Sequence, residues 1–349
     1  MRNKREVATN MEKIRLGRTG LMVSKSGFGA IPIQRISSAE AERLLRKACE
    51  NGINFFDTAR SYTDSEEKIG MALADFRGEI LLATKGKGES RKKVLEDLEM
   101  SLRLLRTDYV DLLQIHNLKA PLDPDVPDGP YQGLLAAREK GMTRFIGMTT
   151  HRLDVALEAA ASGLYDTVQF PLSMISAEKD LGLIAACRDR NIGLIAMKAL
   201  SGGLITNAAA AFAFMRQFDT LVPIWGIQRE RELDEFIALE AHPPALDDAM
   251  RRAIEKDRIE LAGDFCRGCG YCLPCPAGIP IAQAARMSLL LRRTLVQRFL
   301  TDQWKADMAK IRDCQECGHC REQCPYELDT PAILKKMLAD YEAFLERRS

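Results

Sequence analysis

Short apolar runs alternate with helix-like stretches over most of the first 240 residues. Seven runs lie at 54–56, 80–83, 109–115, 145–148, 167–170, 193–197 and 222–225, and a weaker one ends near Phe28. Between them, apolar residues recur three and four positions apart, as at 40–50, 91–105 and 178–189, which is typical of amphipathic helices. Strands that take turns with helices are parallel and joined by helical crossovers. Eight such units close into a barrel of about 250 residues, so the pattern predicts an α/β fold, a (β/α)8 TIM barrel.

An open, doubly wound parallel sheet is the main alternative to a barrel. Dinucleotide-binding sheets of that kind carry G-x-G-x-x-G after the first strand. This chain reads GFGAIP at that place, and the missing motif favours the barrel.

A proline-rich stretch follows the run at 109–115. Residues 117–130 read NLKAPLDPDVPDGP and contain four prolines, which excludes a helix or a central strand. A loop that follows a barrel strand lies on the C-terminal face, where such folds keep their active sites. We therefore expect a long loop there, which either borders the site or is simply a solvated surface loop.

The strand pattern stops near residue 242. Residues 246–263 and 281–300 read as helices, a final helix is expected over 330–347, and no strand signal remains. We therefore predict a flexible N-terminal tail at 1–13, the barrel at 14–242, and a small C-terminal α-helical domain at 243–349.

Composition and charge exclude several classes of protein. The formal net charge is +1, so no global field favours nucleic acid or an anionic membrane surface. No apolar run approaches the roughly 20 residues that a membrane span needs. The N-terminus MRNKREVATN lacks the apolar core of a signal peptide. We expect a cytoplasmic protein with no nucleic acid and no membrane among its partners.

Eight of the ten cysteines lie in two clusters after residue 265. C-x2-C spacing without a signal peptide indicates metal rather than disulfides. The second cluster, Cys314-x2-Cys317-x2-Cys320-x3-Cys324-Pro325, has the spacing of bacterial ferredoxins, in which three close cysteines bind one [4Fe–4S] cube and the fourth binds the other. The first cluster has one residue fewer before its last cysteine and comprises Cys266, Cys269, Cys272 and Cys275.

Two [4Fe–4S] clusters are therefore the predicted metal groups. In the crossed pattern, one cube joins Cys324 to the first three cysteines of the first cluster, and the other joins Cys275 to the first three of the second. Zinc is the alternative, although zinc sites usually show two separated C-x2-C pairs. His319 is expected to donate a hydrogen bond to a cluster sulfur rather than to bind iron. The 38 residues between the clusters, helical in pattern, resemble the helical ferredoxin-like domains fused to many redox enzymes.

Residues 14–239 resemble the aldo-keto reductase superfamily. The opening IRLGRTGLMVSKSGFG is similar to the start of many bacterial members, and NFFDTARSY, ATKG and LLQIH follow at the ends of successive predicted strands. The resemblance, to the bacterial and archaeal subgroup with a C-terminal ferredoxin-type domain, implies an oxidoreductase that uses NADH or NADPH on a small carbonyl or alcohol substrate. It also implies a catalytic tetrad of Asp57, Tyr62, Lys85 and His116.

The tetrad suits the reduction of a carbonyl, which needs hydride at carbon and a proton at oxygen. A free tyrosine has a pKa of about 10 and is a weak acid at neutral pH. A neighbouring ammonium, Lys85, is expected to lower the pKa of Tyr62, and Asp57 would keep that lysine charged and in place. His116 could hydrogen-bond the carbonyl oxygen and orient the substrate.

The same resemblance suggests the residues that hold the cofactor. FIGMTTH, VQF, MKALSGG and VPIWGIQRERELDEF match stretches that line the nicotinamide, the pyrophosphate and the adenosine. The implied cofactor-binding residues are Thr149, Thr150, Gln169, Leu200, Gly203, Gly226, Gln228, Arg229 and Glu235. The Thr pair replaces the usual Ser-Asn, and Glu232 replaces an arginine that often binds the 2′-phosphate. The choice between NADH and NADPH therefore stays open.

Nicotinamides pass two electrons as hydride, whereas a [4Fe–4S] cube passes one, and a flavin usually mediates between them. Three hypotheses follow. Electrons could pass between the barrel and a ferredoxin- or flavodoxin-like partner through the clusters, with or without a bound flavin. Alternatively, the protein is a carbonyl reductase whose clusters are structural or sense oxidation. The third hypothesis, a regulatory module on a degenerate barrel, is disfavoured by the intact tetrad.

Overall fold

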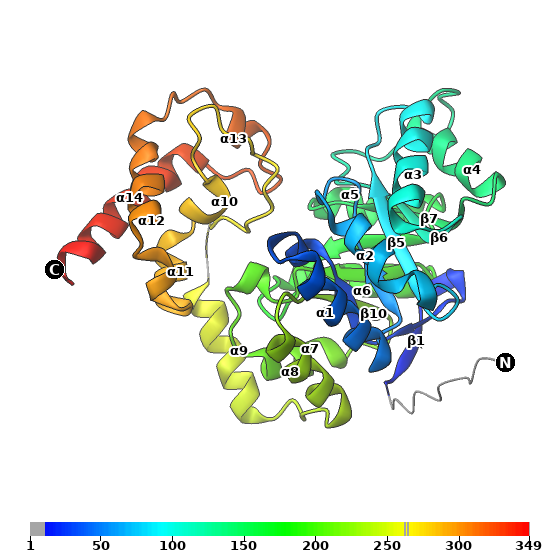
Figure 1. Ribbon diagram of the computed structural model, residues 1–349, viewed down its shortest axis with the longest axis horizontal. Coiled ribbons are helices and arrows are strands. Elements are labelled where there is room, and N and C mark those ends of the chain that lie inside the picture. Colours follow the sequence, from blue (N-terminus) through cyan, green and yellow to red (C-terminus); the bar gives the residue numbers. More distant parts are fainter. Residues whose placement is uncertain (1–10, 262, 264, 349) are drawn as a thin grey trace. The chain divides into compact units, whose positions relative to one another are not determined.

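Eight parallel strands close into a barrel in the computed structural model, which describes residues 11–261, 263 and 265–348 (Figure 1). Each strand pairs with the next along the chain, and the last pairs with the first. The strands are β3 (Gly27–Gly29), β4 (Phe55–Asp57), β5 (Leu81–Gly86), β6 (Val110–Ile115), β7 (Thr143–Thr149), β8 (Thr167–Pro171), β9 (Gly193–Met197) and β10 (Leu221–Gly226). The predicted barrel is confirmed, and the open-sheet alternative is excluded.

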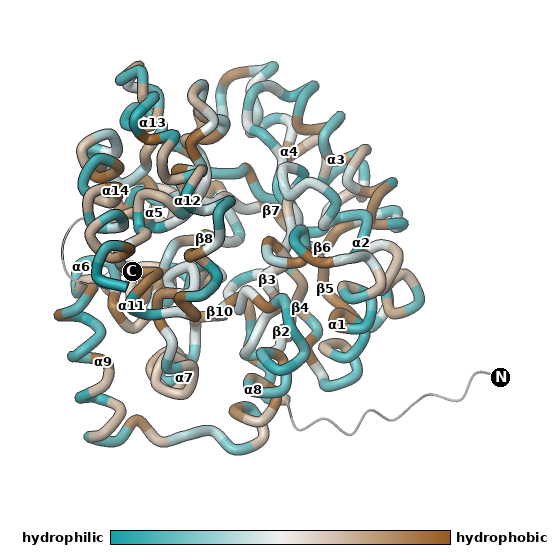
Figure 2. Tube along the Cα trace, turned by 60° about the vertical axis from the view of Figure 1, so that its left-hand side comes forward, coloured by the Kyte–Doolittle hydropathy of each residue, from teal (hydrophilic) through white to brown (hydrophobic). Residues whose placement is uncertain are grey.

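Helices connect the barrel strands. They are α1 (Ser38–Glu50), α2 (Ser65–Leu73), α3 (Arg91–Leu105), α4 (Pro130–Glu139), α5 (Leu153–Ser162), α6 (Glu178–Asp189), α7 (Ala208–Arg216) and α8 (Glu230–Ala241). Local sequence explains where α1 begins, because Ser37 and Glu40 form a reciprocal capping box. Apolar residues are concentrated in the strands, as along β6 (Figure 2).

An antiparallel hairpin that the sequence did not predict precedes the barrel. It consists of β1 (Lys13–Arg15) and β2 (Met22–Ser24). Its apolar residues Ile14 and Val23 pack in one buried cluster with Phe55 and Val222, which lie at the beginning of β4 and β10. The hairpin thus covers the N-terminal end of the barrel. Residues 1–10 of the tail expected at 1–13 lie outside the described residues. Lys13, the last residue of that expected tail, belongs to β1.

The loop predicted at 117–130 is present. Residues 117–129 form neither helix nor strand, and Pro130 begins α4 in the first turn, where a missing backbone N–H has no cost. The loop follows β6, so it begins on the C-terminal face of the barrel.

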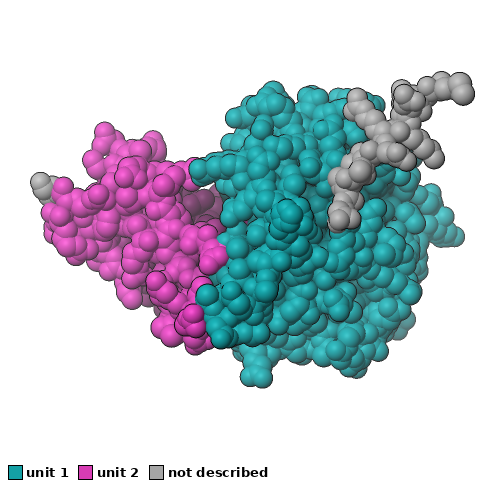
Figure 3. Space-filling view, turned by 90° about the horizontal axis from the view of Figure 1, so that it is seen from below, with its two compact units in different colours: residues 1–199, 208–251 teal, residues 200–207, 252–349 magenta. Residues whose placement is uncertain are grey.

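The chain divides into two compact units (Figure 3). The first contains Met1–Ala199 and Ala208–Arg251, and the second contains Leu200–Asn207 and Arg252–Ser349. These limits differ from the predicted domains, because eight residues from the middle of the chain belong to the second unit and the barrel unit extends to Arg251. No helix within the described residues is long and apolar enough to cross a membrane.

The second unit is helical, as predicted. Its helices are α9 (Asp248–Glu260), which begins in the first unit, α10 (Ile281–Ala284), α11 (Met287–Arg293), α12 (Asp302–Ala309), α13 (His319–Glu322) and α14 (Thr330–Glu346). The prediction of a single helix over 281–300 is wrong. Non-helical dihedral angles at Arg286 and an extended Thr294 divide it into α10, α11 and a short 3-10 turn at Val296–Phe299. The break lets Ala284, Met287 and Leu291 join one core with α14.

Candidate active site and cysteine clusters

The four residues of the expected tetrad lie at the C-terminal ends of three neighbouring strands. Asp57 is the last residue of β4, Lys85 is the next-to-last residue of β5, and His116 directly follows β6. Tyr62 lies in the turn between β4 and α2. Because these strands are parallel and paired in register, their carboxyl ends meet on one face of the barrel.

A buried ion pair forms the base of this group. The Nζ atom of Lys85 donates to Oδ1 of Asp57 at 2.6 Å and to the carbonyl oxygen of Thr58 at 2.6 Å. Both side chains are almost fully buried, with 1% and 2% exposure. Burial raises the pKa of Asp57 and lowers that of Lys85, and each shift is opposed by the partner charge. The side-chain amides of Gln114 and Gln169 also donate to Asp57, at 3.4 and 3.5 Å.

The Tyr62 ring lies above this ion pair. Lys85 Nζ is 5.2 Å from the centre of the ring. The pKa of Tyr62 is nevertheless raised, first because its hydroxyl is buried and second because of the charge of Asp57. The lowering expected from Lys85 is therefore wrong for the protein without cofactor, because the ammonium is neutralised by its ion pair. Tyr62 keeps its proton at neutral pH, as a proton donor must.

His116 completes the group. Its ring meets that of Tyr62 edge to face, with 5.7 Å between ring centres. Burial, and then the charges of Lys85 and Lys198, lower the pKa of His116 to about 3, so the imidazole is neutral at pH 7. Its Nδ1 is 3.2 Å from the hydroxyl of Ser61. The Ser61 hydroxyl can donate to Nδ1 in the tautomer that carries its proton on Nε2.

The three polar residues expected around the nicotinamide are buried and already hydrogen-bonded. Thr149 accepts from the backbone N–H of Asn117 at 2.8 Å, and Thr150 donates to the carbonyl of Leu118 at 2.8 Å. Both hydroxyls thus hold the beginning of the 117–129 loop. Gln169 accepts from Gln114 at 2.8 Å and lies beside the tetrad.

The residues expected at the adenosine end lie between β10 and α8. Gly226 ends β10, and Arg229 precedes the first residue of α8. Glu232 accepts from the backbone N–H of Gln228 at 3.0 Å. It also pairs with Arg229 at 3.5 Å, so the positive charge of the arginine balances the negative charge of this carboxylate. Glu235 is exposed on α8.

Two features of these segments fit a dinucleotide. Oε1 of Gln228 is buried and has no hydrogen-bond partner within the described chain, so a ligand N–H would satisfy it. Ser201, Gly202 and Gly203 form a turn with successive positive φ angles of 49°, 65° and 86°. Backbone N–H groups in such turns can bind anions, and that of Gly203 donates here to the carbonyl oxygen of Leu200 at 2.9 Å. Leu200 and Gly203, expected at the pyrophosphate, lie in this turn, which belongs to the second unit.

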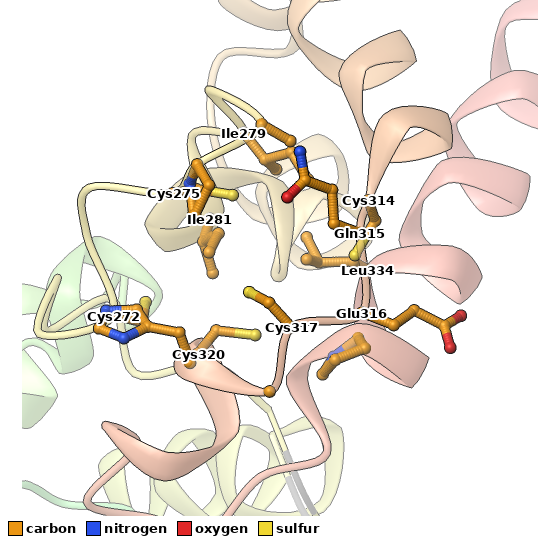
Figure 4. Close-up of a pocket in the computed structure, with 15 residues that line it drawn as sticks. Cys272, Cys275, Ile279, Ile281, Cys314, Gln315, Glu316, Cys317, Cys320 and Leu334 are labelled. Carbon is orange, nitrogen blue, oxygen red and sulfur yellow. The ribbon is translucent and has the colours of Figure 1, made fainter.

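Five cysteines from both sequence clusters line one hollow of about 400 Å³ in the second unit. Figure 4 shows Cys272 and, around the hollow, the group of Cys275, Cys314, Cys317 and Cys320. Burial raises the pKa of Cys320, and the charges of the other three act in the same direction. This is the set in which Cys275 joins the second cluster.

The other four cysteines form a second neighbourhood. Burial raises the pKa of Cys266, and the charges of Cys269 and Cys324 add to the shift. Burial raises the pKa of Cys272 to about 12, with added effects from Cys266 and Cys269 and a smaller one from Cys320 of the other group. Among the described residues, no three His, Cys, Asp or Glu side chains are placed to hold a single metal ion.

Comparison with known families identifies both parts. A model of the aldo/keto reductase family matches residues 25–240, more than half of the chain. The chain belongs to the aldo/keto reductase family. A model described as a 4Fe-4S dicluster domain matches residues 265–329, which contain all eight clustered cysteines.

Several aldo/keto reductases and related enzymes are similar to this chain. L-galactose dehydrogenase of Arabidopsis thaliana is 31% identical over 218 residues, 57% of this chain and 68% of that protein. An aldo-keto reductase of Bacillus subtilis is 27% identical over 217 residues, 56% of this chain and 64% of that protein. An aldo-keto reductase from Bacillus halodurans, in its holo form, superposes with a TM-score of 0.62 at 22% identity over 71% of this chain and 96% of that one. This last likeness shows the fold.

Two residues near these sites were missed from the sequence. Lys198 directly follows β9, and its charge lowers the pKa of both His116 and His151, after burial. The signal was available, because Lys198 ends a predicted strand as Lys85 does. Arg286 lies beside Cys266 and opposes the rise in the pKa of that thiol. Nothing in its local sequence distinguishes it from the other arginines of the helical domain.

Proposed function

We propose that this aldo/keto reductase transfers hydride between a nicotinamide cofactor and the carbon of a small carbonyl or alcohol substrate, with Tyr62 as the general acid and base. The observation that carries the proposal is the buried Asp57–Lys85 ion pair beneath Tyr62, with a neutral His116 at the edge of the same ring. These groups meet at the end of the barrel where enzymes of this fold place their chemistry.

The residues divide the work as follows. The cofactor, when bound, supplies the hydride that reaches the carbonyl carbon. Tyr62 donates its phenolic proton to the carbonyl oxygen, so the product is the alcohol and Tyr62 is left as a phenolate. Lys85 stabilises that phenolate through the field of its ammonium, and Asp57 keeps the ammonium charged in its buried position. Neutral His116 donates a hydrogen bond that orients the carbonyl oxygen.

The residues that would hold the cofactor are those that the resemblance implies. Thr149, Thr150 and Gln169 are proposed for the nicotinamide, and Leu200 and Gly203 for the pyrophosphate. The adenosine end would be held by Gly226, Gln228, Arg229 and Glu235. Because Glu232 already pairs with Arg229, a 2′-phosphate would have to compete for that guanidinium. This pairing favours NADH over NADPH.

We further propose that the eight clustered cysteines bind two [4Fe–4S] clusters in the crossed arrangement. The two neighbourhoods of four thiols support this pairing. The clusters would pass electrons between the barrel and a ferredoxin- or flavodoxin-like partner, with a flavin as an optional mediator. All ten cysteines are free of disulfides, as ligand thiols must be, and this supports a reducing compartment such as the cytoplasm.

The first test is Tyr62→Phe in the cluster-loaded protein. Loss of the proton donor should lower kcat for carbonyl reduction by about 10²–10⁴-fold, while the Kd of the nicotinamide cofactor changes little. Steady-state kinetics over a panel of aldehydes and ketones, with cofactor fluorescence for Kd, measure both quantities.

Tyr109→Phe is the matched control. Tyr109 immediately precedes β6 at the opposite end of that strand, so removal of its hydroxyl should leave turnover unchanged. If Tyr62→Phe retained most of the activity, Tyr62 would not be the acid. If the parent protein turned over no carbonyl or alcohol, the regulatory alternative would be favoured.

A further inference from the structure

The segment Leu200–Asn207 is a part of the second unit, although only two residues separate it from the end of the barrel strand β9. Leu204 is fully buried and Ile205 is 3% exposed. The segment also contains Leu200 and Gly203, which are proposed for the cofactor pyrophosphate. The helical domain therefore determines the conformation of a stretch that the barrel chemistry needs.

The side chain of Arg286 connects this segment with the first cysteine cluster. Its side chain is buried, and Nη1 donates to the carbonyl oxygen of Gly202 at 3.0 Å. The guanidinium also lies against Gly268, a residue that stands between Cys266 and Cys269 in the sequence. A Cβ atom at Gly268 would be 2.8 Å from Cζ of Arg286, and one at Gly202 would be 2.8 Å from Nη1. Arg286 is thus packed between two glycines, one in each segment.

A second arginine holds the same segment from the other end of α11. Nε of Arg293 donates to the carbonyl oxygen of Leu204 at 2.7 Å, and its two Nη groups pair with Asp257 and Glu260 of α9. Two arginines flanking one short helix therefore bind carbonyls two residues apart in the segment. Only the first of them also packs on the turn that carries cysteine ligands.

We infer that Arg286 is a positioning residue through which the first cysteine cluster controls the Leu200–Asn207 segment. When Cys266, Cys269 and Cys272 hold their iron–sulfur cluster, the Gly268 turn is fixed, Arg286 is fixed against it, and the carbonyl of Gly202 is held. Loss of the cluster releases the turn, the guanidinium and the segment together.

This inference deepens the proposed function and rests on it for one consequence. If Leu200 and Gly203 bind the cofactor, loading of the first cluster strengthens cofactor binding, and by linkage the bound cofactor stabilises the cluster to the same extent. Cluster damage would then switch off reduction by weakening cofactor binding, with the catalytic tetrad intact.

Hydrogen–deuterium exchange of the full chain tests the inference without relying on activity. Peptides that cover residues 200–207 are followed in cluster-loaded and iron-depleted protein. We expect exchange to become about fivefold or more faster on iron removal. Cluster-loaded Arg286→Met should show the same acceleration. Arg292→Met, in an exposed arginine of the same helix, is the matched control and should behave as the parent. Equal exchange in loaded and depleted parent protein, or in loaded Arg286→Met and parent, would overturn the inference.

A second pair of variants tests the coupling in the reverse direction, in case Arg286→Met does not take up iron. Gly202→Ala would press on Arg286, whereas Gly203→Ala has a similar positive φ but its Cβ would meet nothing within 4 Å. We expect Gly202→Ala to lose iron to a chelator about fivefold or more faster than Gly203→Ala. Equal rates of iron loss would contradict the inference.

The expected effect of the first cluster on cofactor binding is measured separately. The Kd values of NADH and NADPH are compared for loaded and iron-depleted parent protein, and we expect weaker binding after depletion by about fivefold or more. If the loaded parent binds neither nucleotide, the proposed function fails, and the exchange and iron-loss results still decide whether Arg286 couples the two segments.

Discussion

Tyr62 and His116 contact each other edge to face, and both are uncharged at neutral pH. Burial and the Asp57 charge keep the phenol protonated, and burial together with Lys85 and Lys198 keeps the imidazole neutral. In the proposed reaction, these two groups would donate hydrogen bonds to the carbonyl oxygen as neutral side chains. The proposal therefore favours reduction, whereas alcohol oxidation needs the scarcer phenolate.

The two pKa shifts predict a pH dependence. Because the pKa of Tyr62 is raised, reduction should not decline between about pH 6 and pH 9, whereas alcohol oxidation should increase with pH as phenolate forms. Because the pKa of His116 is about 3, neither rate should show an ionisation near the usual histidine value of about 6.5. Profiles of kcat/KM in both directions measure this. An inflection near that value that disappears in His116→Gln would contradict the assignment.

At the residue scale, the sequence predicted which side chains meet but not their energetics. Asp57, Tyr62, Lys85 and His116 were expected together because they match the tetrad that the family resemblance implies. The direction of the Tyr62 shift was wrong, because it depends on the depth of the phenol and on whether the lysine charge is already balanced. Neither quantity can be read from strand ends.

At the scale of elements, the stability of the helical domain is expected to depend on metal binding by its cysteines. The second unit has a small apolar core in which Cys272 and Cys320 pack with residues of α10, α11 and α14. Small domains of this kind use metal binding as folding free energy. The cysteines proposed as ligands would therefore contribute to stability as well as to redox chemistry.

This dependence predicts the effect of Cys317→Ser. One ligand of the Cys275 set is lost, so we expect lower iron content and a helical domain that unfolds at a lower temperature. Iron analysis and thermal unfolding followed by circular dichroism measure the two effects. Cys49→Ser, on α1 in the barrel unit, should retain the parent's iron. Equal iron content in Cys317→Ser and the parent would show that Cys317 is not a ligand.

Elements with strong periodicity were predicted, and those fixed by tertiary contacts were not. The strands β5 to β10 and the helices α1, α3 and α6 lie within a few residues of their expected positions. The hairpin of β1 and β2 was missed because β1, Lys-Ile-Arg, has one apolar residue and gives no apolar run. The helix expected over 281–300 breaks where its apolar residues turn toward the core with α14, a contact far away in sequence.

At the scale of the whole molecule, the number of electrons that the nicotinamide releases can be compared with the number that the proposed clusters accept. A nicotinamide releases two electrons, and each [4Fe–4S] cube accepts one, so two cubes together accept both electrons and one proton is released. The proposed pair of clusters is thus the smallest number that balances one hydride. A flavin would provide the conversion to single electrons.

This balance predicts an optical change. We expect NADH or NADPH to bleach the visible absorption of the anaerobically purified, cluster-loaded protein, and dithionite to bleach it to the same end point. Spectra recorded during stepwise titration measure it, and a titration of iron-depleted protein is the control. Bleaching by dithionite alone, with carbonyl turnover intact, would show that the clusters do not take part in turnover.

The assignment of Leu200–Asn207 to the second unit has a consequence for protein engineering. A gene fragment that starts at residue 252 lacks the stretch that supplies two buried apolar side chains, Leu204 and Ile205, and the acceptors for two arginines. Grafting this ferredoxin-type part onto another reductase would therefore require a second, internal exchange of eight codons. A chimera joined only at the C-terminal boundary would carry a mismatched loop and an incompletely filled core.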